Sequence, residues 1–217
     1  MIYVNVPFSP KDTGKDLGYA YNKFCESLPN NNDWACFLDH DAMFTTSTWY
    51  HQLEDIIDKH NNHGVFGART NRINSTYQLV GNIDIYNHDI MYHREIGKHL
   101  QKKYYSDTLR ITDDTAQRGF SGIVILIKKS TWEKIGGFIS GFNDVDNNLR
   151  YSLEKHNIPM YIMNGVYAYH WYKADQPYDR CYDKFKTIDN NYKLNNMQNF
   201  DIQNVFLYNG TAEELPI

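Results

Sequence analysis

Two aspartates, Asp39 and Asp41, stand one residue apart directly after the apolar segment 34–38. An apolar run of this length predicts a buried strand, and open α/β sheets place ligands at the carboxyl ends of such strands. Two neighbouring carboxylates repel each other and are costly to desolvate unless a cation lies between them and a ligand. Mg²⁺ or Mn²⁺ carrying a nucleotide diphosphate suits this pattern, because both ions prefer oxygen ligands. A strand that ends in a polar turn gives the same short pattern.

A second acidic pair and one histidine could complete such a site. Asp144 and Asp146 stand at the predicted start of a helix, where unpaired N–H groups tolerate carboxylates, so Asp144 is either a helix cap or a chemical group. His170 lies near the end of the alternating segment 166–171, which predicts a strand. A histidine there is either a packed residue or a ligand, and two acids that need a cation favour the ligand.

Length and composition exclude several classes of protein. The chain has 217 residues, enough for one domain with a full hydrophobic core, and its formal net charge of −4 gives no electrostatic basis for binding nucleic acid. No apolar run approaches the roughly 20 residues that span a bilayer, and the first residues do not resemble a signal peptide. We therefore expect a cytoplasmic protein with three reduced thiols, at Cys25, Cys36 and Cys181.

Apolar periodicity alternates between strands and helices along the chain. Short apolar runs predict strands at 2–6, 34–38, 65–68, 123–127, 160–163 and 166–171. Helical spacing predicts helices at 17–28, 47–60, 87–105, 131–135, 143–157 and 178–188. Asp16 and Ser130 are the expected N-caps of the helices that follow them. The expected apolar face of the helix at 87–105 consists of Ile90, Met91, Ile96 and Leu100. This alternation predicts an α/β fold, in which a mixed, mostly parallel sheet is flanked by helices.

The order of these pieces resembles that of a glycosyltransferase of the GT-A fold, and it is most similar to the family 2-like group and the related galactosyltransferases. The matching pieces are LDHDAMF at 38–44, GFSGIVILIKKSTWEKIGGF at 119–138, FNDVDNNLRYSL at 142–153, YAYHWY at 167–172 and GKDLGYAYNKF at 14–24. The resemblance covers residues 2–171. It implies a single Rossmann-like GT-A catalytic domain at 1–172, with 173–217 as a C-terminal tail that packs on or beside it.

The resemblance also implies a nucleotide-sugar-dependent transferase with Mn²⁺ or Mg²⁺ as its cofactor. Asp39 would lie near the donor ribose and the metal, while Asp41 and His170 would bind the metal directly. Asp144 would be the catalytic base, because it matches the position of the base in inverting relatives. Asp146 would hold the acceptor or support Asp144.

Four further residues would contact the donor by the same resemblance. Asn22 would face the site from its helix, and Ser121 and Gly122 would line the donor sugar. The acid that usually holds the nucleotide base has no clear counterpart here, because the first strand runs directly into the helix that carries Asn22. Asp12 is the nearest acid to that position.

The expected activity is transfer of a sugar from a UDP- or GDP-sugar to a hydroxyl group of a glycan or another acceptor, with inversion at the anomeric carbon. Arg69 and Arg72 are either phosphate contacts or ordinary loop charges.

A non-catalytic protein of the same fold that binds a nucleotide or a sugar stays open as an alternative function. A nucleotidyltransferase would carry a glycine-rich phosphate loop with Arg and Lys after the first strand, and a two-metal hydrolase would need a second cluster of ligands; the sequence favours neither. The donor, the acceptor and the oligomeric state stay undetermined.

Overall fold

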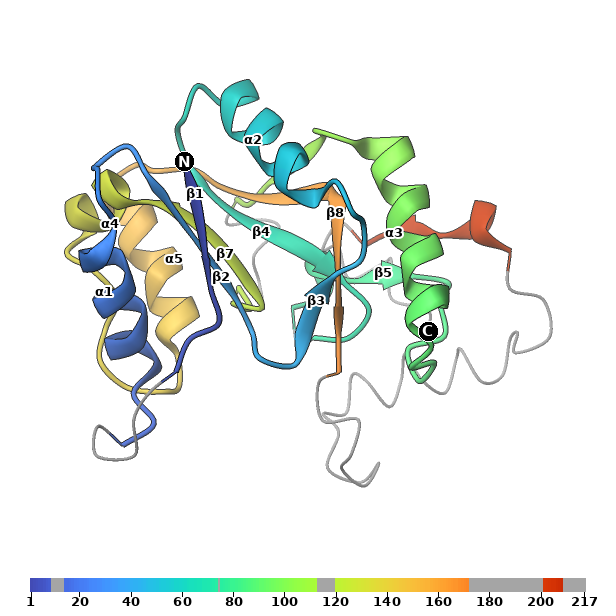
Figure 1. Ribbon diagram of the computed structural model, residues 1–217, viewed down its shortest axis with the longest axis horizontal. Helices are drawn as coiled ribbons and strands as arrows, with labels where there is room; N and C mark the ends of the chain where they lie inside the picture. Colours follow the sequence, from blue (N-terminus) through green and yellow to red (C-terminus); the bar gives the residue numbers. More distant parts are fainter. Residues whose placement is uncertain (9–13, 74, 113–119, 172–200, 209–217) are drawn as a thin grey trace.

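A seven-stranded mixed sheet forms the centre of the computed structural model, which describes residues 1–8, 14–73, 75–112, 120–171 and 201–208 (Figure 1). In spatial order its strands are β1 (Ile2–Asn5), β2 (Trp34–Leu38), β7 (Val124–Lys128), β4 (Val65–Thr70), β8 (Met160–His170) and β3 (Ala42–Phe44), and β6 (Thr108–Arg110) also pairs with β8. A second, two-stranded sheet joins β5 (Val80–Gly81) to β9 (Phe206–Leu207). The predicted α/β class with a mixed sheet is confirmed.

The prediction that the sheet is mostly parallel is wrong. β1, β2, β4 and β8 run in one direction, but among the described strands only β1–β2 and β4–β8 are parallel neighbours. β7 lies between β2 and β4 and is antiparallel to both, and β3 and β6 are antiparallel to β8. The alternation of strands and helices does not report these directions, because a long connection can bring a strand into the sheet from either end.

Helices cover both faces of the sheet (Figure 1). Alternate side chains of β2 pack against different helices. On one face, α1 (Leu17–Ser27), α4 (Lys129–Ile135) and α5 (Val145–Lys155) contribute to a cluster that includes Ala35 and Phe37 of β2. On the other face, α2 (Trp49–Lys59) packs with Trp34 and Cys36 of the same strand. Because successive strand residues point to opposite faces, a strand covered on both sides needs a continuous apolar run.

The remaining long helix, α3 (Ile90–Tyr104), packs along β8 (Figure 1). The carboxylate of Asp89 caps it by accepting a hydrogen bond from the backbone N–H of Met91 at 2.8 Å. Ile96 and Leu100 point inward as predicted, whereas Ile90 and Met91 are exposed. Within the part of the chain that the structure describes, no helix combines the length and apolar composition that crossing a membrane requires.

Two predicted local features differ from the structure. The carboxylate of Asp16 caps α1 as predicted, but Ser130 lies inside α4, whose N-cap is Lys128 without a capping hydrogen bond from its side chain. The two strands predicted at 160–163 and 166–171 are one continuous strand, β8. The polar Asn164 lies between the two predicted strands, and its side chain is held by hydrogen bonds with Arg69 and Asp107. Asn164 is therefore accommodated in a strand that is buried almost throughout. The helix predicted at 178–188 lies outside the described residues.

Two of the three cysteines are described, and both are free thiols in the core. Cys25 lies on α1 and Cys36 on β2. Burial raises the pKa of each thiol to about 12, so both are held as unreactive thiols at neutral pH. The prediction of reduced cysteines is confirmed for these two, and Cys181 lies outside the described residues.

The first turn of α1 lies against the loop that precedes α5. The backbone N–H of Gly18 donates to the carbonyl of Gly141 at 3.1 Å, and a Cβ atom added to Gly18 would lie 1.7 Å from the carbonyl oxygen of Ile139. The carboxylate of Asp16 also accepts hydrogen bonds from Ser140 and from the backbone of Gly141. These contacts fix the loop that leads to Asp144.

Gly18→Ala should therefore destabilise the protein, although alanine is the better helix former. We expect the free energy of unfolding in urea to fall by about 2–3 kcal/mol, because the added methyl group meets a backbone carbonyl that cannot move alone. Ser27→Ala, in the exposed last turn of the same helix, is the control and should change stability by less than about 0.5 kcal/mol. Equal stability of the two variants would contradict this close contact.

Candidate functional site

Asp39, Asp41 and His170 come together at the end of β2, and we call these three residues the acid–histidine cluster. The Nε2 atom of His170 lies 3.2 Å from Oδ1 of Asp41 and 3.9 Å from Oδ2 of Asp39. One ligand atom from each residue lies within 4.8 Å of the others. The two acids follow β2, and the antiparallel pairing of β3 with β8 sets Ala42 opposite His170. Strand pairing therefore closes a gap of about 130 positions in the sequence.

The segment after β4 fixes His170: the side chain of Asn71 holds its backbone, and the carbonyl of Arg72 holds its ring. Its backbone N–H donates to Oδ1 of Asn71 at 2.8 Å, and Nδ2 of Asn71 donates to the carbonyl of His170 at 3.1 Å. Nδ1 of the ring lies 3.0 Å from the carbonyl oxygen of Arg72, which can only accept, so Nδ1 carries the proton. The Nε2 atom therefore faces the two acids, which is the orientation that metal-binding histidines usually have.

The two carboxylates of the cluster have different environments. Burial raises the pKa of Asp39 to about 6; His170 opposes this shift, and the negative charges of Asp41 and Asp146 add to it. Burial acts on Asp41 as well, but the hydrogen bond and charge of His170 outweigh it and hold the pKa of Asp41 below its ordinary value. Acids whose pKa values are pushed apart in this way are typical of functional sites.

Asp146 lies beside the cluster, at the start of α5. Its Oδ2 atom accepts a hydrogen bond from the backbone N–H of Gly122 at 3.0 Å, and Oδ1 accepts one from the N–H of Asn147 at 2.9 Å. The next residue, Ile123, accepts a backbone hydrogen bond from the N–H of Asp39 at 3.0 Å. The end of β2, the start of β7 and the start of α5 therefore meet at one place. Burial raises the pKa of Asp146, and the Gly122 N–H opposes that shift.

Asp144 precedes α5 in a left-handed conformation, with φ of 61° and ψ of 10°, and its side chain does not cap the helix. Its carboxylate is exposed and accepts a hydrogen bond from Nδ2 of Asn147 at 3.2 Å. Left-handed backbone is unfavourable for most residues and is enriched at functional positions. The structure thus gives the two acids different situations: Asp146 is tied to the backbone, and Asp144 is accessible.

Ser121 and Gly122, predicted to line the donor sugar, lie in the loop that leads into β7. The amide of Gln78 brackets Ser121, accepting from its N–H at 2.9 Å and donating to its carbonyl at 3.0 Å. Both residues are partly exposed next to Asp146. The loop is therefore held in place by side chains from distant parts of the chain.

Asn22, predicted to face a ligand, instead joins α1 to the loop after α4. Its Oδ1 atom accepts from Nε1 of Trp132 and from the backbone N–H of Phe138, each at 2.8 Å, and its Nδ2 donates to the carbonyl of Phe138 at 2.9 Å. Three of the four hydrogen-bonding positions of this amide are thereby used within the fold. Asp12, the other predicted contact on this side, lies outside the described residues.

Neither Arg69, which lies within β4, nor Arg72, which follows it, is an ordinary loop charge. Arg69 is 0% exposed, and its guanidinium donates to Oδ1 of Asn164 and to the carbonyls of Tyr77 and Tyr208. Arg72 is also buried, with its guanidinium 5.2 Å from the ring centroid of Tyr86. Burial and these acceptors exclude Arg69 as a phosphate contact in this conformation, and they make it a tether for the described part of the C-terminal tail.

The positioning residues of the site were missed by the sequence analysis. Asn71 and Gln78 have no signal of their own, because each acts on backbone that is 43 or more positions away. The contacts of His88 were also missed, although the helix predicted at 87–105 contains this residue. The contacts of Asn71, Gln78 and His88 join segments that are distant in sequence, so only the tertiary structure reveals them.

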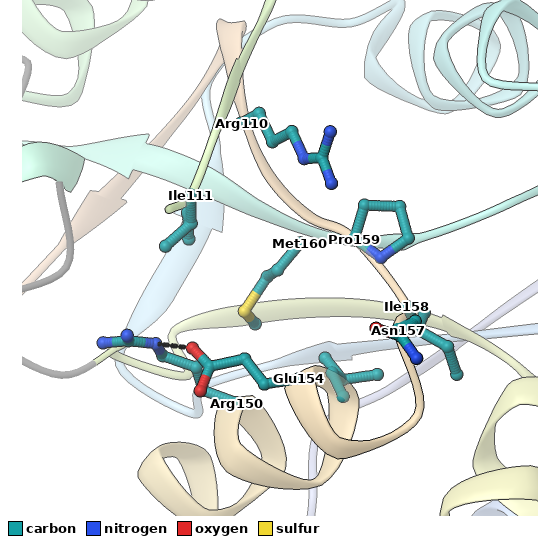
Figure 2. Close-up of a pocket in the computed structure, with 9 residues that line it drawn as sticks. Arg110, Ile111, Arg150, Glu154, Asn157, Ile158, Pro159 and Met160 are labelled. Carbon is teal, nitrogen blue, oxygen red and sulfur yellow. Dashed lines mark hydrogen bonds and ion pairs between the residues drawn. The ribbon is translucent and has the colours of Figure 1, made fainter. Parts of the chain in front are cut away.

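A separate pocket lies at the other end of β8 and α5 (Figure 2). It is lined by Arg110, Ile111, Arg150, Leu153, Glu154, Asn157, Ile158, Pro159 and Met160. Nε of Arg150 donates to Oε1 of Glu154 at 2.7 Å, so the two charges balance each other (Figure 2). Met160 and His170 are the first and last residues of β8. This pocket is therefore not part of the acid–histidine cluster.

No protein-family model matches this sequence, and the search of curated proteins finds no match.

The donor set of the cluster fits a divalent cation. Two carboxylates and one imidazole nitrogen suit Mn²⁺, while Mg²⁺ more often takes oxygen ligands alone.

Asp41→Asn should therefore weaken Mn²⁺ binding at least about tenfold in calorimetry, because it removes the charge closest to His170. Asp58→Asn removes the same charge from the exposed side of α2 and should leave the affinity unchanged. Equal affinity of the two variants would rule out the cluster as the metal site.

Proposed function

We propose that this protein is a metal-dependent glycosyltransferase, which moves a sugar from a nucleotide-diphosphate sugar to an acceptor hydroxyl group. One observation carries the proposal: Asp39, Asp41 and His170, which are distant in sequence, meet with Nε2 of the histidine directed at both acids. The start of α5, with Asp144 and Asp146, lies beside them. A charge-rich site of this kind suits a diphosphate held through a divalent cation.

The acid–histidine cluster would hold Mn²⁺ or Mg²⁺, with Mn²⁺ favoured by the imidazole ligand. When bound, the cation would neutralise the negative charge that develops on the departing diphosphate. Asn71 and the carbonyl of Arg72 act on this site through His170, because they fix the tautomer and direction of its ring.

Asp144 is the residue that we assign as catalytic base. A sugar hydroxyl is a weak nucleophile, so a carboxylate that accepts its proton lowers the barrier as the oxygen attacks the anomeric carbon. In that step the bond from the anomeric carbon to the diphosphate oxygen breaks, and a single displacement inverts the configuration. Asp144 suits this role because its carboxylate is accessible, whereas both oxygens of Asp146 accept backbone hydrogen bonds. Asp146 thus supports the loop that carries Ser121 and Gly122.

The donor is proposed to be a UDP- or GDP-sugar. Ser121 and Gly122 lie next to Asp146 and are partly exposed, so they can line the sugar that is transferred. Asp39 can bind both the cation and the ribose, since it lies at the end of β2 with its carboxylate half-buried. Asn22 is left out of this assignment because its amide is engaged with Trp132 and Phe138.

Binding of a nucleotide diphosphate should require the cation. We expect UDP or GDP to bind in the presence of Mn²⁺ at least about tenfold more tightly than in the presence of EDTA, because the cluster alone repels phosphate. Calorimetry of the wild-type chain with both nucleotides measures this difference, and UMP and GMP serve as the matched nucleotides without a diphosphate. If neither diphosphate binds with Mn²⁺, or if both bind equally in EDTA, the proposed function is wrong.

Asp144→Asn should reduce turnover of a nucleotide sugar by about 10²–10⁴-fold, since asparagine cannot accept the proton. Affinity for the nucleotide diphosphate should stay within about twofold of wild type, because Asp144 does not belong to the acid–histidine cluster. Release of the diphosphate, followed by coupled enzymatic detection, measures turnover. Asn143→Ala, at the exposed neighbouring position, is the control for general disturbance of the loop. Full turnover by Asp144→Asn would remove this residue as the base.

A further inference from the structure

Five aromatic side chains contact one another in sequence from the buried part of β8 to its end, and we call them the aromatic ladder: Tyr167, His93, Tyr169, His88 and Trp171. The ring centroids of neighbouring members lie 6.0 Å apart for Tyr167 and His93, 4.2 Å for His93 and Tyr169, 6.3 Å for Tyr169 and His88, and 4.5 Å for His88 and Trp171. β8 contributes Tyr167 and Tyr169, and Trp171 directly follows it. The segment around the start of α3, which packs along β8, contributes the two histidines (Figure 1).

Hydrogen bonds hold the ladder in one arrangement. Nδ1 of His93 lies 2.8 Å from the hydroxyl of Tyr167, and Nε2 of the same ring lies 2.6 Å from the carbonyl of Asn87. Nδ1 of His88 lies 2.7 Å from the hydroxyl of Tyr169. The inner members, Tyr167 and His93, are buried. The hydrogen bond to Tyr169 therefore fixes the ring of His88, and this ring contacts the indole of Trp171.

Trp171 is the exposed end of the ladder and lies beside the acid–histidine cluster. It is 42% exposed, the largest value among the four tryptophans, all of which the structure describes. It directly follows His170, and its backbone N–H donates to the carbonyl of Asp41 at 2.9 Å. This hydrogen bond continues the pairing of β3 with β8, and it joins the backbone of Trp171 to that of Asp41, a member of the cluster.

We propose that the indole of Trp171 is a stacking surface for a sugar ring at the active site. This inference rests on the proposed function, because it assumes that the ligand at the acid–histidine cluster carries a sugar. The ring belongs either to the donor or to the acceptor, and both present the same chemistry to the indole.

The chemistry of the surface suits a pyranose ring. One face of a pyranose presents C–H groups with a weak positive charge, and the face of an indole is electron-rich and apolar. One hydrogen bond joins His88 to Tyr169, so the ring of His88 that contacts the indole is itself held in place. A ring that is already held in place loses little conformational freedom when a ligand stacks on it, so more of the contact energy appears as affinity.

The test compares Trp171→Ala and Trp171→Phe with Tyr151→Ala, a control that removes an aromatic ring with 63% exposure from α5. Calorimetry with Mn²⁺ uses UDP, UDP-glucose, GDP, GDP-mannose, and the free disaccharides lactose and cellobiose. We expect Trp171→Ala to weaken binding of a sugar-bearing probe about three- to tenfold, while affinity for Mn²⁺ and for the nucleotide diphosphate stays at the wild-type value. Trp171→Phe should recover part of the loss, and Tyr151→Ala should lose nothing.

The pattern of losses identifies the source of the ring. Loss confined to a nucleotide sugar assigns the ring to the donor, and loss confined to a free disaccharide assigns it to the acceptor. An equal loss for the diphosphate and its sugar conjugate would overturn the inference in favour of stacking on the nucleobase. Unchanged affinity for every probe that the wild type binds would also overturn it, with the proposed function intact.

Failure of the proposed function has a different signature. If neither nucleotide binds with Mn²⁺ but a disaccharide binds in a manner that depends on Trp171, the sugar surface stands and the transferase assignment fails. If the wild-type chain binds none of the probes, both are overturned. Unchanged Mn²⁺ affinity in Trp171→Ala shows that the variant has kept the fold around His170.

Discussion

Two carboxylates that repel each other are held together in a half-buried position, and the structure around them is arranged to maintain that position. Asp39 and Asp41 lie at the end of β2, and the imidazole of His170, which contacts Asp41, is a group that can offset their charge. The pKa of Asp39 is raised to about 6, mainly by burial, while contact with His170 keeps that of Asp41 low. Such an arrangement costs stability unless a further positive charge is present. The divalent cation that we propose for this site would supply that charge.

The loop before β7 connects this cluster to the start of α5. Ile123 accepts a hydrogen bond from the N–H of Asp39, and Gly122 donates one to Asp146, so the two acidic segments are joined through adjacent residues. The amide of Gln78 holds the same loop from the other side. The site therefore rests on side chains that satisfy backbone groups, and its geometry depends on the packing of the whole sheet. A shift of one strand would separate the acids from each other and from the imidazole.

The two sides of the cluster differ in chemical character. On the side of α5, Asp144 and Asp146 present carboxylates, one accessible and one tied to the backbone. On the side of β8 and α3, the aromatic ladder ends in the exposed indole of Trp171. A ligand with a charged diphosphate, a polar hydroxyl group that loses a proton, and an apolar sugar face could use all three environments at once. This match of a mixed ligand to a mixed site unites the proposed function with the inferred role of Trp171.

The sequence by itself determined where most strands and helices lie, because apolar periodicity and caps such as Asp16 are local. It also selected Asp39, Asp41 and His170, since acids and a histidine at predicted strand ends stand out by residue type. The tertiary structure decided the direction of β7, the burial of Arg69, the engagement of Asn22 with Phe138, and the contacts of Asn71 and Gln78. Those features depend on which strands are neighbours and on which distant backbone groups a side chain meets. Spacing along the chain contains no record of either, because long connections allow many pairings with the same local pattern.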